Sequence, residues 1–424
     1  MPSPVTTAPA APTVGAGSAA SAVARLRRTA TIRAHAQALL ARARAGRSLV
    51  FAVNDERLNP VADFVAELTR QRYPNLQLPY HSRWRHFEAD GVDRVALTVW
   101  PHDVAERARA QIDLAVVSVL LDAGAGAAWR YAEPRTGLVL QRSEGLGVAS
   151  LHAFTAGLFS IDPQRPLRVD AAALRSLDPT ALAAAFQAGP DNPLVGLEGR
   201  AALLRRLGDT LAARPDLFGP THRPGGLFDT LQARCAGRAA RAHDLLDLIL
   251  EGLSPAWLAD NRLNGVPLGD CWPLPALADT DGFRTDDPAA GWMPFHKLSQ
   301  WLAYSLIEPL EWAGVPIDTL DDLTGLPEYR NGGLLIDGGV LTLRDTSLAT
   351  SPLRPGDAAV IEWRALTVAL LDELLPLVRA RLDRPDLPLA CLLEGGTWAA
   401  GRQWAQRLRG GAPPLQIESD GTVF

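Results

Sequence analysis

The sequence predicts a mainly α-helical protein with a few small β-hairpins. Through most of the chain, apolar residues recur at spacings of three and four, which is typical of amphipathic helices. Glycine and proline separate these stretches, and apolar–polar alternation is confined to short segments. Hydrophobic residues make up 47% of the 424 positions, so the chain can bury a sizeable core.

The predicted helices follow in order from this periodicity. The stretch 20–45 carries many arginines opposite its apolar face, and 104–121 ends where Asp122 begins a run of alanine and glycine. Lys297 lies in the first turn of 295–312, and 360–382 is the longest apolar helix. The full set of predicted helices is 20–45, 59–72, 104–121, 144–159, 171–187, 194–213, 236–251, 295–312, 360–382 and 401–408.

Two segments predict β structure. Residues 78–98 carry paired aromatics, a turn at Gly91 and an alternating run, which indicates a hairpin or an irregular loop. Residues 332–343 have two apolar runs on either side of Asp337 and two glycines, which predicts a hairpin. Residues 262–294 show no clear periodicity, so we expect a long irregular connection there.

The first 20 residues are rich in Ala, Pro, Ser and Thr and predict a disordered tail. They lack the basic and apolar regions of a secretory signal. We expect residues 21–424 to form one large, mostly helical domain, with two lobes, about 21–230 and 231–424, as the alternative.

Composition limits the partners of this chain. The formal net charge of −5 argues against a nucleic-acid partner, and no apolar run approaches the roughly 20 residues of a membrane span. The three cysteines are far apart and show no zinc-ligand spacing, which fits buried thiols in a reducing cytoplasm. We therefore expect a cytoplasmic protein with a small-molecule substrate, no metal and no nucleotide cofactor.

Lys297 is the only lysine among the 42 basic residues. Arginine cannot replace lysine where a compact ammonium or an adjustable pKa is needed, so this lysine is a candidate functional group. Its survival by chance is the alternative. Gln300 lies three positions later on the same predicted helix face, and Tyr304 continues that row.

A polar turn follows, in which Glu328, Tyr329, Arg330 and Asn331 stand next to one another. Loops between rigid elements commonly hold functional groups, although an ordinary polar turn is also consistent with this composition. Arg364, two positions after Glu362, reads most simply as part of a structural ion pair.

Two further clusters combine charged and aromatic side chains. The first could hold a phosphate, and a hairpin packed by its own aromatics is the alternative. The second follows the helix at 104–121, and Ser143 within it could cap the next helix, which is predicted to begin at Glu144. The members of the first are His81, Arg83, Arg85 and His86, and those of the second are Asp122, Trp129, Arg142 and Glu144.

The strings HSRWRHF, LLDAGAGAAWRY, RSEGL, FHKLSQW and LPEYRNGG resemble the fourth protein family of the uracil-catabolism pathway of fungi and bacteria. The resemblance covers nearly everything after the tail. It implies a role in a pathway in which the uracil ring is opened, ribosylurea is an intermediate and urea is released. It also implies that the protein associates with other enzymes of that pathway.

A more distant resemblance points to a reaction. Queuosine-nucleotide N-ribosylhydrolases, which are similar to helix–hairpin–helix DNA glycosylases, carry three motifs in the same order. Glu328 stands where that family has a key aspartate, and Asn331 departs from its pattern, so details of base recognition do not carry over. The matching positions are Phe295, His296, Lys297 and Gln300, then Glu328, Tyr329 and Arg330, then Glu362, Trp363 and Arg364.

This resemblance implies a glycosylase-like helical fold and a catalytic domain spanning 21–424. The expected reaction is hydrolysis of the N-glycosidic bond of ribosylurea, or of its 5′-phosphate. Glu328 would stabilise the cationic transition state, Lys297 would assist the leaving group or bind the substrate, and Arg330 and Arg364 would hold a phosphate or brace an acid. A metal-independent amidohydrolase and a non-enzymatic partner of the ring-opening enzyme are the alternatives.

Overall fold

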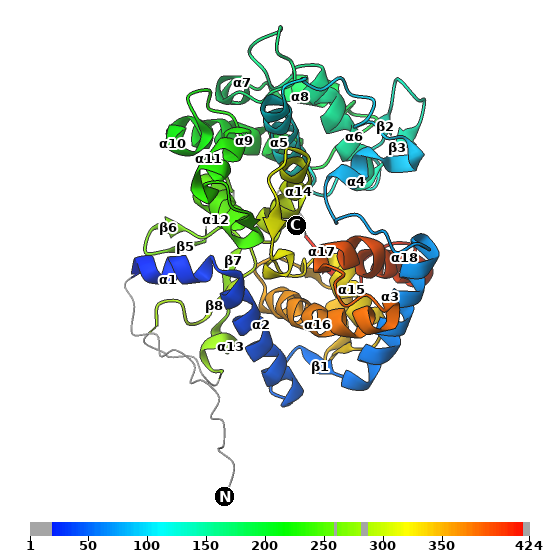
Figure 1. The fold of residues 1–424 in the computed structure, drawn as a ribbon. Coiled ribbons are helices and arrows are strands. Elements are labelled where there is room, and N and C mark those ends of the chain that lie inside the picture. The colour runs from blue at the N-terminus through cyan, green and yellow to red at the C-terminus, as the bar shows by residue number, and fades with distance from the viewer. Residues whose placement is uncertain (1–18, 258–260, 281–286, 419–424) are drawn as a thin grey trace, which may run out of the picture.

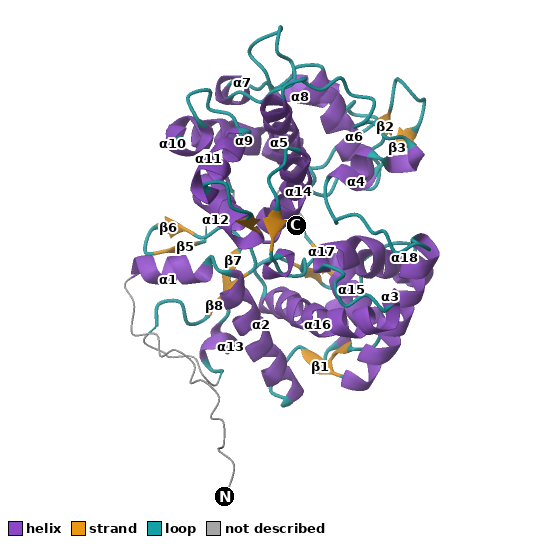
Figure 2. Cartoon of the chain, in the orientation of Figure 1, coloured by secondary structure: helices purple, strands orange, loops and turns teal. Residues whose placement is uncertain are grey.

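The computed structural model describes residues 19–257, 261–280 and 287–418. Within these ranges the protein is mainly helical, as predicted (Figure 2). The helices are α1 (Ala19–Leu26), α2 (Thr29–Arg44), α3 (Leu58–Arg72), α4 (Trp84–Phe87), α5 (Val104–Leu120), α6 (Arg142–Thr155), α7 (Ala171–Arg175), α8 (Pro179–Ala185), α9 (Leu197–Ala213), α10 (Pro215–Phe218), α11 (Gly226–Cys235), α12 (Ala242–Leu253), α13 (Pro275–Ala278), α14 (Lys297–Trp312), α15 (Tyr329–Asp337), α16 (Ala358–Leu382), α17 (Leu389–Leu392) and α18 (Trp398–Arg409).

The strands in the described ranges form two-stranded pairs only. Two pairs are parallel, β4 with β9 and β11 with β12, and the others are antiparallel. The pairs are β1 (Phe51–Val53) with β10 (Leu341–Leu343), β2 (Tyr131–Ala132) with β3 (Val139–Leu140), β4 (Ala240–Arg241) with β9 (Ile317–Asp318), β5 (Arg262–Leu263) with β6 (Val266–Pro267), β7 (Cys271–Pro273) with β8 (Trp292–Pro294), and β11 (Pro352–Leu353) with β12 (Gln416–Ile417).

Two long helices form the centre of the core. In α14 every residue from 299 to 310 is buried, and in α16 every residue from 360 to 371 is buried. α5 and α12 pack against α14, whereas α2 and α3 pack against α16, and α15 packs against α18 (Figure 1). Helices near the start of the chain therefore lie beside helices near its end.

The strongly periodic segments were predicted correctly. α3, α5, α6, α9, α14, α16 and α18 lie where apolar spacing placed helices. Two predicted helices are each interrupted: α1 and α2 replace 20–45, and α7 and α8 replace 171–187. The helix predicted at 236–251 begins later, as α12 at Ala242, after the short strand β4. At the first break the Leu26 carbonyl accepts a hydrogen bond from His296 Nε2 at 2.9 Å, in place of a continuing helix. The predicted tail lies outside the described residues up to position 18, and α1 begins at Ala19.

The hairpin predicted at 332–343 is wrong. Residues Tyr329–Asp337 form α15, because the Glu328 carboxylate caps this helix at its N-terminus. Asp337 and the two glycines end the helix and do not form a hairpin turn, and Gly339 has a φ of 75°. Leu341–Leu343 then pairs as β10 with the distant β1.

The segment 78–98 contains no strand, so its irregular-loop alternative is correct and the hairpin is wrong. Two short helical turns, α4 and the 3-10 turn Ala89–Gly91, replace it. A small hairpin that was not predicted, β2 with β3, follows the glycine run after α5. In the described parts of 262–294, namely 262–280 and 287–294, the strands β5 to β8 and the helix α13 alternate with turns and irregular stretches.

The contact between α15 and α18 depends on Gly401. A Cβ atom at this position would overlap the carbonyl oxygen of Arg330. The two helices therefore approach one another along a surface that has no room for a side chain there. In the described part of the chain, no helix is both long and apolar enough to cross a membrane.

Candidate active site

The site begins where the hairpin β7–β8 leads into α14. Asp270, the residue before β7, accepts hydrogen bonds through its backbone carbonyl from the amides of Phe295 and His296, at 2.9 and 3.1 Å. Its Oδ2 atom accepts a hydrogen bond from the Lys297 amide at 2.9 Å. Asp270 thus caps α14 and fixes the backbone of Lys297.

Arg364 of α16 binds the Asp270 carboxylate. Its Nη1 and Nη2 atoms donate to the two carboxylate oxygens of Asp270 at 2.8 and 2.7 Å, and its guanidinium lies 4.0 Å above the Phe295 ring. Burial raises the pKa of Asp270, but the charge and hydrogen bonds of Arg364 outweigh that effect and hold the pKa below its ordinary value. Arg364, predicted to bind substrate or brace an acid, thus braces Asp270.

Glu328 occupies the N-terminus of α15. Its Oε2 accepts from the Arg330 amide at 2.8 Å, and its Oε1 accepts from the Asn331 amide at 2.6 Å. A carboxylate can accept about four hydrogen bonds, so the helix uses only part of this capacity. Burial raises the pKa of Glu328, and the two amides, Lys297 and His81 oppose this rise.

Lys297 and Glu328 belong to one electrostatic neighbourhood. Burial lowers the pKa of the Lys297 ammonium, and the carboxylate of Glu328 is the strongest influence that opposes this shift. Asp270 and Asp122 also oppose it, whereas the nearby Arg364 adds to it. Lys297 at the N-terminus of α14 therefore interacts electrostatically with Glu328 at the N-terminus of α15.

Asp122 reaches this neighbourhood from the end of α5. It forms an ion pair with Arg83, which is fully buried. Arg83 also donates from Nε to Ser118 Oγ at 2.6 Å and from Nη1 to His86 Nδ1 at 2.8 Å. Burial raises the pKa of Asp122, and Arg83 and Lys297 oppose that rise.

A cavity of about 420 Å³ lies between the segment around α4, the start of α6 and the first turns of α18. It brings together five of the predicted residues, and it adds acidic and basic residues that were not predicted. Glu144 pairs with Arg402 across it at 2.6 Å, and Arg85 pairs with Glu308 at 2.6 Å. The predicted residues among its walls are His81, Arg85, His86, Arg142 and Glu144.

Three other predicted substrate-binding residues make contacts within the fold. Trp129 is fully buried and donates from Nε1 to the Phe186 carbonyl at 3.0 Å. The buried Gln300 donates from Nε2 to Thr324 Oγ1 at 2.7 Å, and Asn331 donates from Nδ2 to the Leu326 carbonyl at 3.0 Å. These contacts explain the residue types without a ligand.

Arg330 and Tyr329 lie at the edge of the site. The Arg330 guanidinium lies 4.7 Å from the centre of the Tyr329 ring and donates to the Gly411 carbonyl at 3.1 Å. Tyr329 is 37% exposed. An exposed aromatic ring and a buried arginine therefore directly follow Glu328 in the first turn of α15.

Sequence reasoning missed Asp270 and Glu394. Asp270 lies in the segment without periodicity, where nothing marked it as the cap of a helix. Glu394 lies in a π-helix, Leu393–Thr397, and the two glycines directly after it were the only local signal. Among the residues that the structure describes, no three His, Cys, Asp or Glu side chains are arranged to hold a metal ion.

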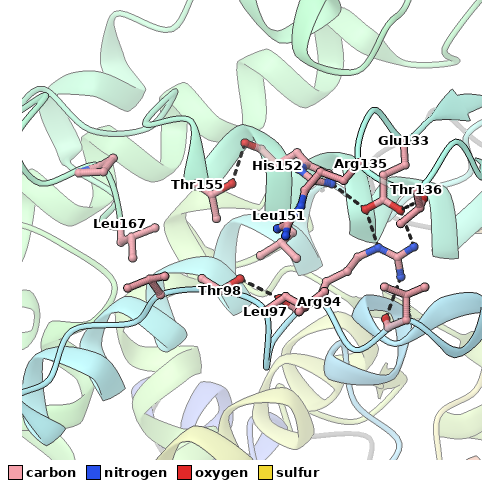
Figure 3. A pocket seen from close by; sticks show the side chains of 13 residues that line it. Arg94, Leu97, Thr98, Glu133, Arg135, Thr136, Leu151, His152, Thr155 and Leu167 are labelled. Atoms are coloured by element: carbon pink, nitrogen blue, oxygen red, sulfur yellow. Dashed lines mark hydrogen bonds and ion pairs between the residues drawn. The ribbon is translucent and has the colours of Figure 1, made fainter.

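A second cavity, of about 310 Å³, lies between 92–99 and α6 (Figure 3). At its wall, Glu133 accepts hydrogen bonds from Arg94 at 2.7 and 2.6 Å and from Thr136 at 2.5 Å. His152 Nε2 lies 2.8 Å from Glu133 Oε1. The Glu133 carboxylate is thus saturated by side chains of its own fold.

Glu133 predicts a pH dependence of stability. Its hydrogen bonds with Arg94 lower its pKa to about 2. A carboxyl with a lowered pKa in the folded state stabilises the protein above its ordinary pKa of about 4.3, and this contribution is lost as pH falls toward about 2. In urea unfolding, the stability gap between wild type and Glu133→Gln is expected to be widest above about pH 5 and to narrow in acid. A gap that stays constant to about pH 3 would contradict this assignment.

The fold and the site together define a helical protein with a lysine–carboxylate cluster at two helix N-termini. Residues 25–424 match the model of a family described as "Protein of unknown function (DUF1688)", and the chain belongs to this family. It is 39% identical over 406 residues to "Uracil catabolism protein 4" of Lachancea kluyveri, covering 88% of this chain and 92% of the relative. It is 40% identical over 420 residues to "Protein urg3" of Schizosaccharomyces pombe, covering 95% and 99%.

Proposed function

We propose that this protein is an N-ribosylhydrolase of uracil catabolism that cleaves the N-glycosidic bond of ribosylurea, or of its 5′-phosphate, and releases urea. The electrostatic interaction between Lys297 and Glu328 carries this proposal, because an ammonium and a carboxylate together suit glycosidic hydrolysis. The name of the Lachancea kluyveri relative supports the pathway.

Glu328 fits the demands of the transition state. Hydrolysis at C1′ passes through an oxocarbenium-like state, which a nearby carboxylate stabilises. The amides of Arg330 and Asn331 hold this carboxylate in place, and its remaining acceptor positions can orient the attacking water.

Lys297 supplies the opposite charge. Three carboxylates, those of Glu328, Asp270 and Asp122, act on its ammonium group and favour the protonated form. In the proposed complex it donates to the urea oxygen or to a ribose hydroxyl. Three arginines of the 420 Å³ cavity, Arg85, Arg142 and Arg402, would hold a 5′-phosphate.

The direct test incubates the purified protein with ribosylurea and, separately, with ribosylurea 5′-phosphate, without the ring-opening enzyme. Urea and free ribose or ribose phosphate are expected in equal amounts from at least one of the two compounds. If neither compound releases urea while the purified ring-opening enzyme is active on its own substrate, the proposal fails. Release of ammonia in place of urea would favour the amidohydrolase alternative.

Lys297→Arg is expected to lower kcat/KM by about 10²-fold, because a planar guanidinium cannot take the place of a compact ammonium in a buried site. Urea release measures this effect, and circular dichroism checks the fold. Arg175→Lys, which changes an exposed ion pair with Asp209, is the control and should leave activity unchanged. A non-enzymatic partner of the ring-opening enzyme would tolerate Lys297→Arg.

A further inference from the structure

His81 is held in one orientation from several sides. Its Nδ1 atom lies 2.8 Å from Glu394 Oε2, and its backbone amide donates to the Ala390 carbonyl at 2.8 Å. The imidazole ring lies 6.0 Å from the Trp398 ring. His81 is 7% exposed and Glu394 is 8% exposed, so both partners of the hydrogen bond are buried.

The π-helix Leu393–Thr397 places Glu394 opposite this histidine. Single π turns are rare and occur frequently at functional sites. The segment packs too closely for side chains at Gly395 and Gly396, whose Cβ atoms would overlap Leu78 and lie 2.8 Å from Val65 Cγ1. Burial raises the pKa of Glu394, but its hydrogen bond with His81 and the charge of Arg72 bring the pKa below its ordinary value. Glu394 is therefore a carboxylate that orients His81.

The other edge of the imidazole lies at the site. Because Nδ1 donates to Glu394, the second nitrogen, Nε2, is on the far side of the ring, and no described residue forms a hydrogen bond with it. His81 lines the 420 Å³ cavity. Its charge is also the smallest of the influences that oppose the raised pKa of Glu328, so the two side chains interact electrostatically.

No other histidine near the site has this arrangement. His86 Nδ1 accepts a hydrogen bond from Arg83, and burial together with that cation lowers the pKa of His86 well below its ordinary value. His296 donates to the Leu26 carbonyl inside the fold. His152 pairs with Glu133 at the same 2.8 Å, but in the other cavity (Figure 3).

We propose that His81, oriented by Glu394, is the general acid that protonates the urea leaving group. This inference rests on the proposed N-ribosylhydrolase function. As the C1′–N bond breaks, its electron pair stays on nitrogen, which takes the proton from His81 Nε2. The oxygen of water bonds to C1′, and Glu328 accepts the proton that the water loses. Urea is a poor leaving group without this proton, and such acid catalysis contributes about 10²–10⁴-fold to a rate.

Charged and titratable groups face His81 from several elements. Its ring pairs with Glu394 of the π-helix, and Arg72 of α3 and Arg85 and His86 of α4 line the same cavity. Because the acid must carry its proton, kcat/KM is expected to fall on the alkaline side. A base that activates water would instead lose activity on the acidic side.

The test compares wild type and His81→Gln on two substrates with different leaving groups. One is the form of ribosylurea that wild type hydrolyses, and the other is p-nitrophenyl β-ribofuranoside 5′-phosphate, whose leaving group departs without a proton. We expect His81→Gln to lower kcat on ribosylurea by about 10²-fold or more, and on the p-nitrophenyl compound by only a few-fold. The alkaline fall in kcat/KM should disappear in this variant.

Two further variants complete the design. Glu394→Gln should lower kcat on ribosylurea more than on the p-nitrophenyl compound, because a neutral amide orients the imidazole less firmly than the carboxylate does. This variant tests the proposal if His81→Gln does not fold. His152→Gln, which alters the equivalent pair in the other cavity, should keep wild-type kinetics.

The outcomes separate the two proposals. Equal losses on both substrates, or an alkaline fall that persists in His81→Gln, would show that His81 is structural. If wild type releases urea from neither form of ribosylurea, the proposed hydrolase function fails first, and the role of His81 falls with it.

Discussion

Glu328→Gln is expected to lower kcat for urea release by about 10²–10⁴-fold, with a smaller change in KM. The substitution keeps the size of the side chain but removes the negative charge that faces the oxocarbenium-like transition state. It also leaves only one carbonyl oxygen for the two amides of Arg330 and Asn331. We therefore expect a loss of stability on the order of 1 kcal/mol in addition to the loss of turnover.

A matched control separates capping from chemistry. Asp103 caps α5 in the same way, accepting from the Glu106 amide at 2.8 Å, and is exposed. Asp103→Asn should leave kcat at the wild-type value. Normal turnover in Glu328→Gln would remove Glu328 from the mechanism, and comparable losses in both variants would reduce its role to that of a helix cap.

Arg364→Ala is expected to have the largest effect on stability, about 3–5 kcal/mol. The substitution leaves the Asp270 carboxylate buried without its bidentate partner, and Asp270 is the residue that caps α14. The free energy of unfolding in urea measures the loss. Removing Asp270 as well should recover part of it, because no unpaired buried charge remains in the double variant.

A surface pair provides the comparison for Arg364. Arg175 and Asp209 lie 2.7 Å apart, but both side chains are more than half exposed. Arg175→Ala is expected to cost at most about 1 kcal/mol. If Arg364→Ala costs no more than this surface change, the Asp270–Arg364 pair does not organise the start of α14.

The helical elements were predictable where local pattern decides. α5, α14 and α16 follow from apolar spacing over many turns, so their positions do not depend on distant partners. A strand was predicted where β10 lies, but its partner could not be predicted, because β1 lies far away in the sequence, with Phe51 opposite Leu343. The sequence of α15 predicts part of a hairpin because Asp-Gly-Gly is a strong turn signal, whereas the capping by Glu328 is seen only in the folded structure.

The site was predictable only in part, for a similar reason. Lys297 is a candidate because it is the only lysine of the chain, and Glu328 is one because it stands among several polar residues in a predicted turn. Asp270, by contrast, acquires its role only when Arg364, 94 positions later, is brought against it. Trp129 and Gln300 were selected for their residue types, but their partners are groups of the fold that no local pattern reveals.

The packing of α2 and α3 against α16 has a consequence for biosynthesis. Arg33 of α2 pairs with Asp372 of α16 across 339 positions of sequence, and the ribosome makes the second helix long after the first. Until then the apolar faces of α2 and α3 have no native cover. Contacts between such distant segments form late and slowly, so the nascent chain depends on protection from aggregation until translation is nearly finished.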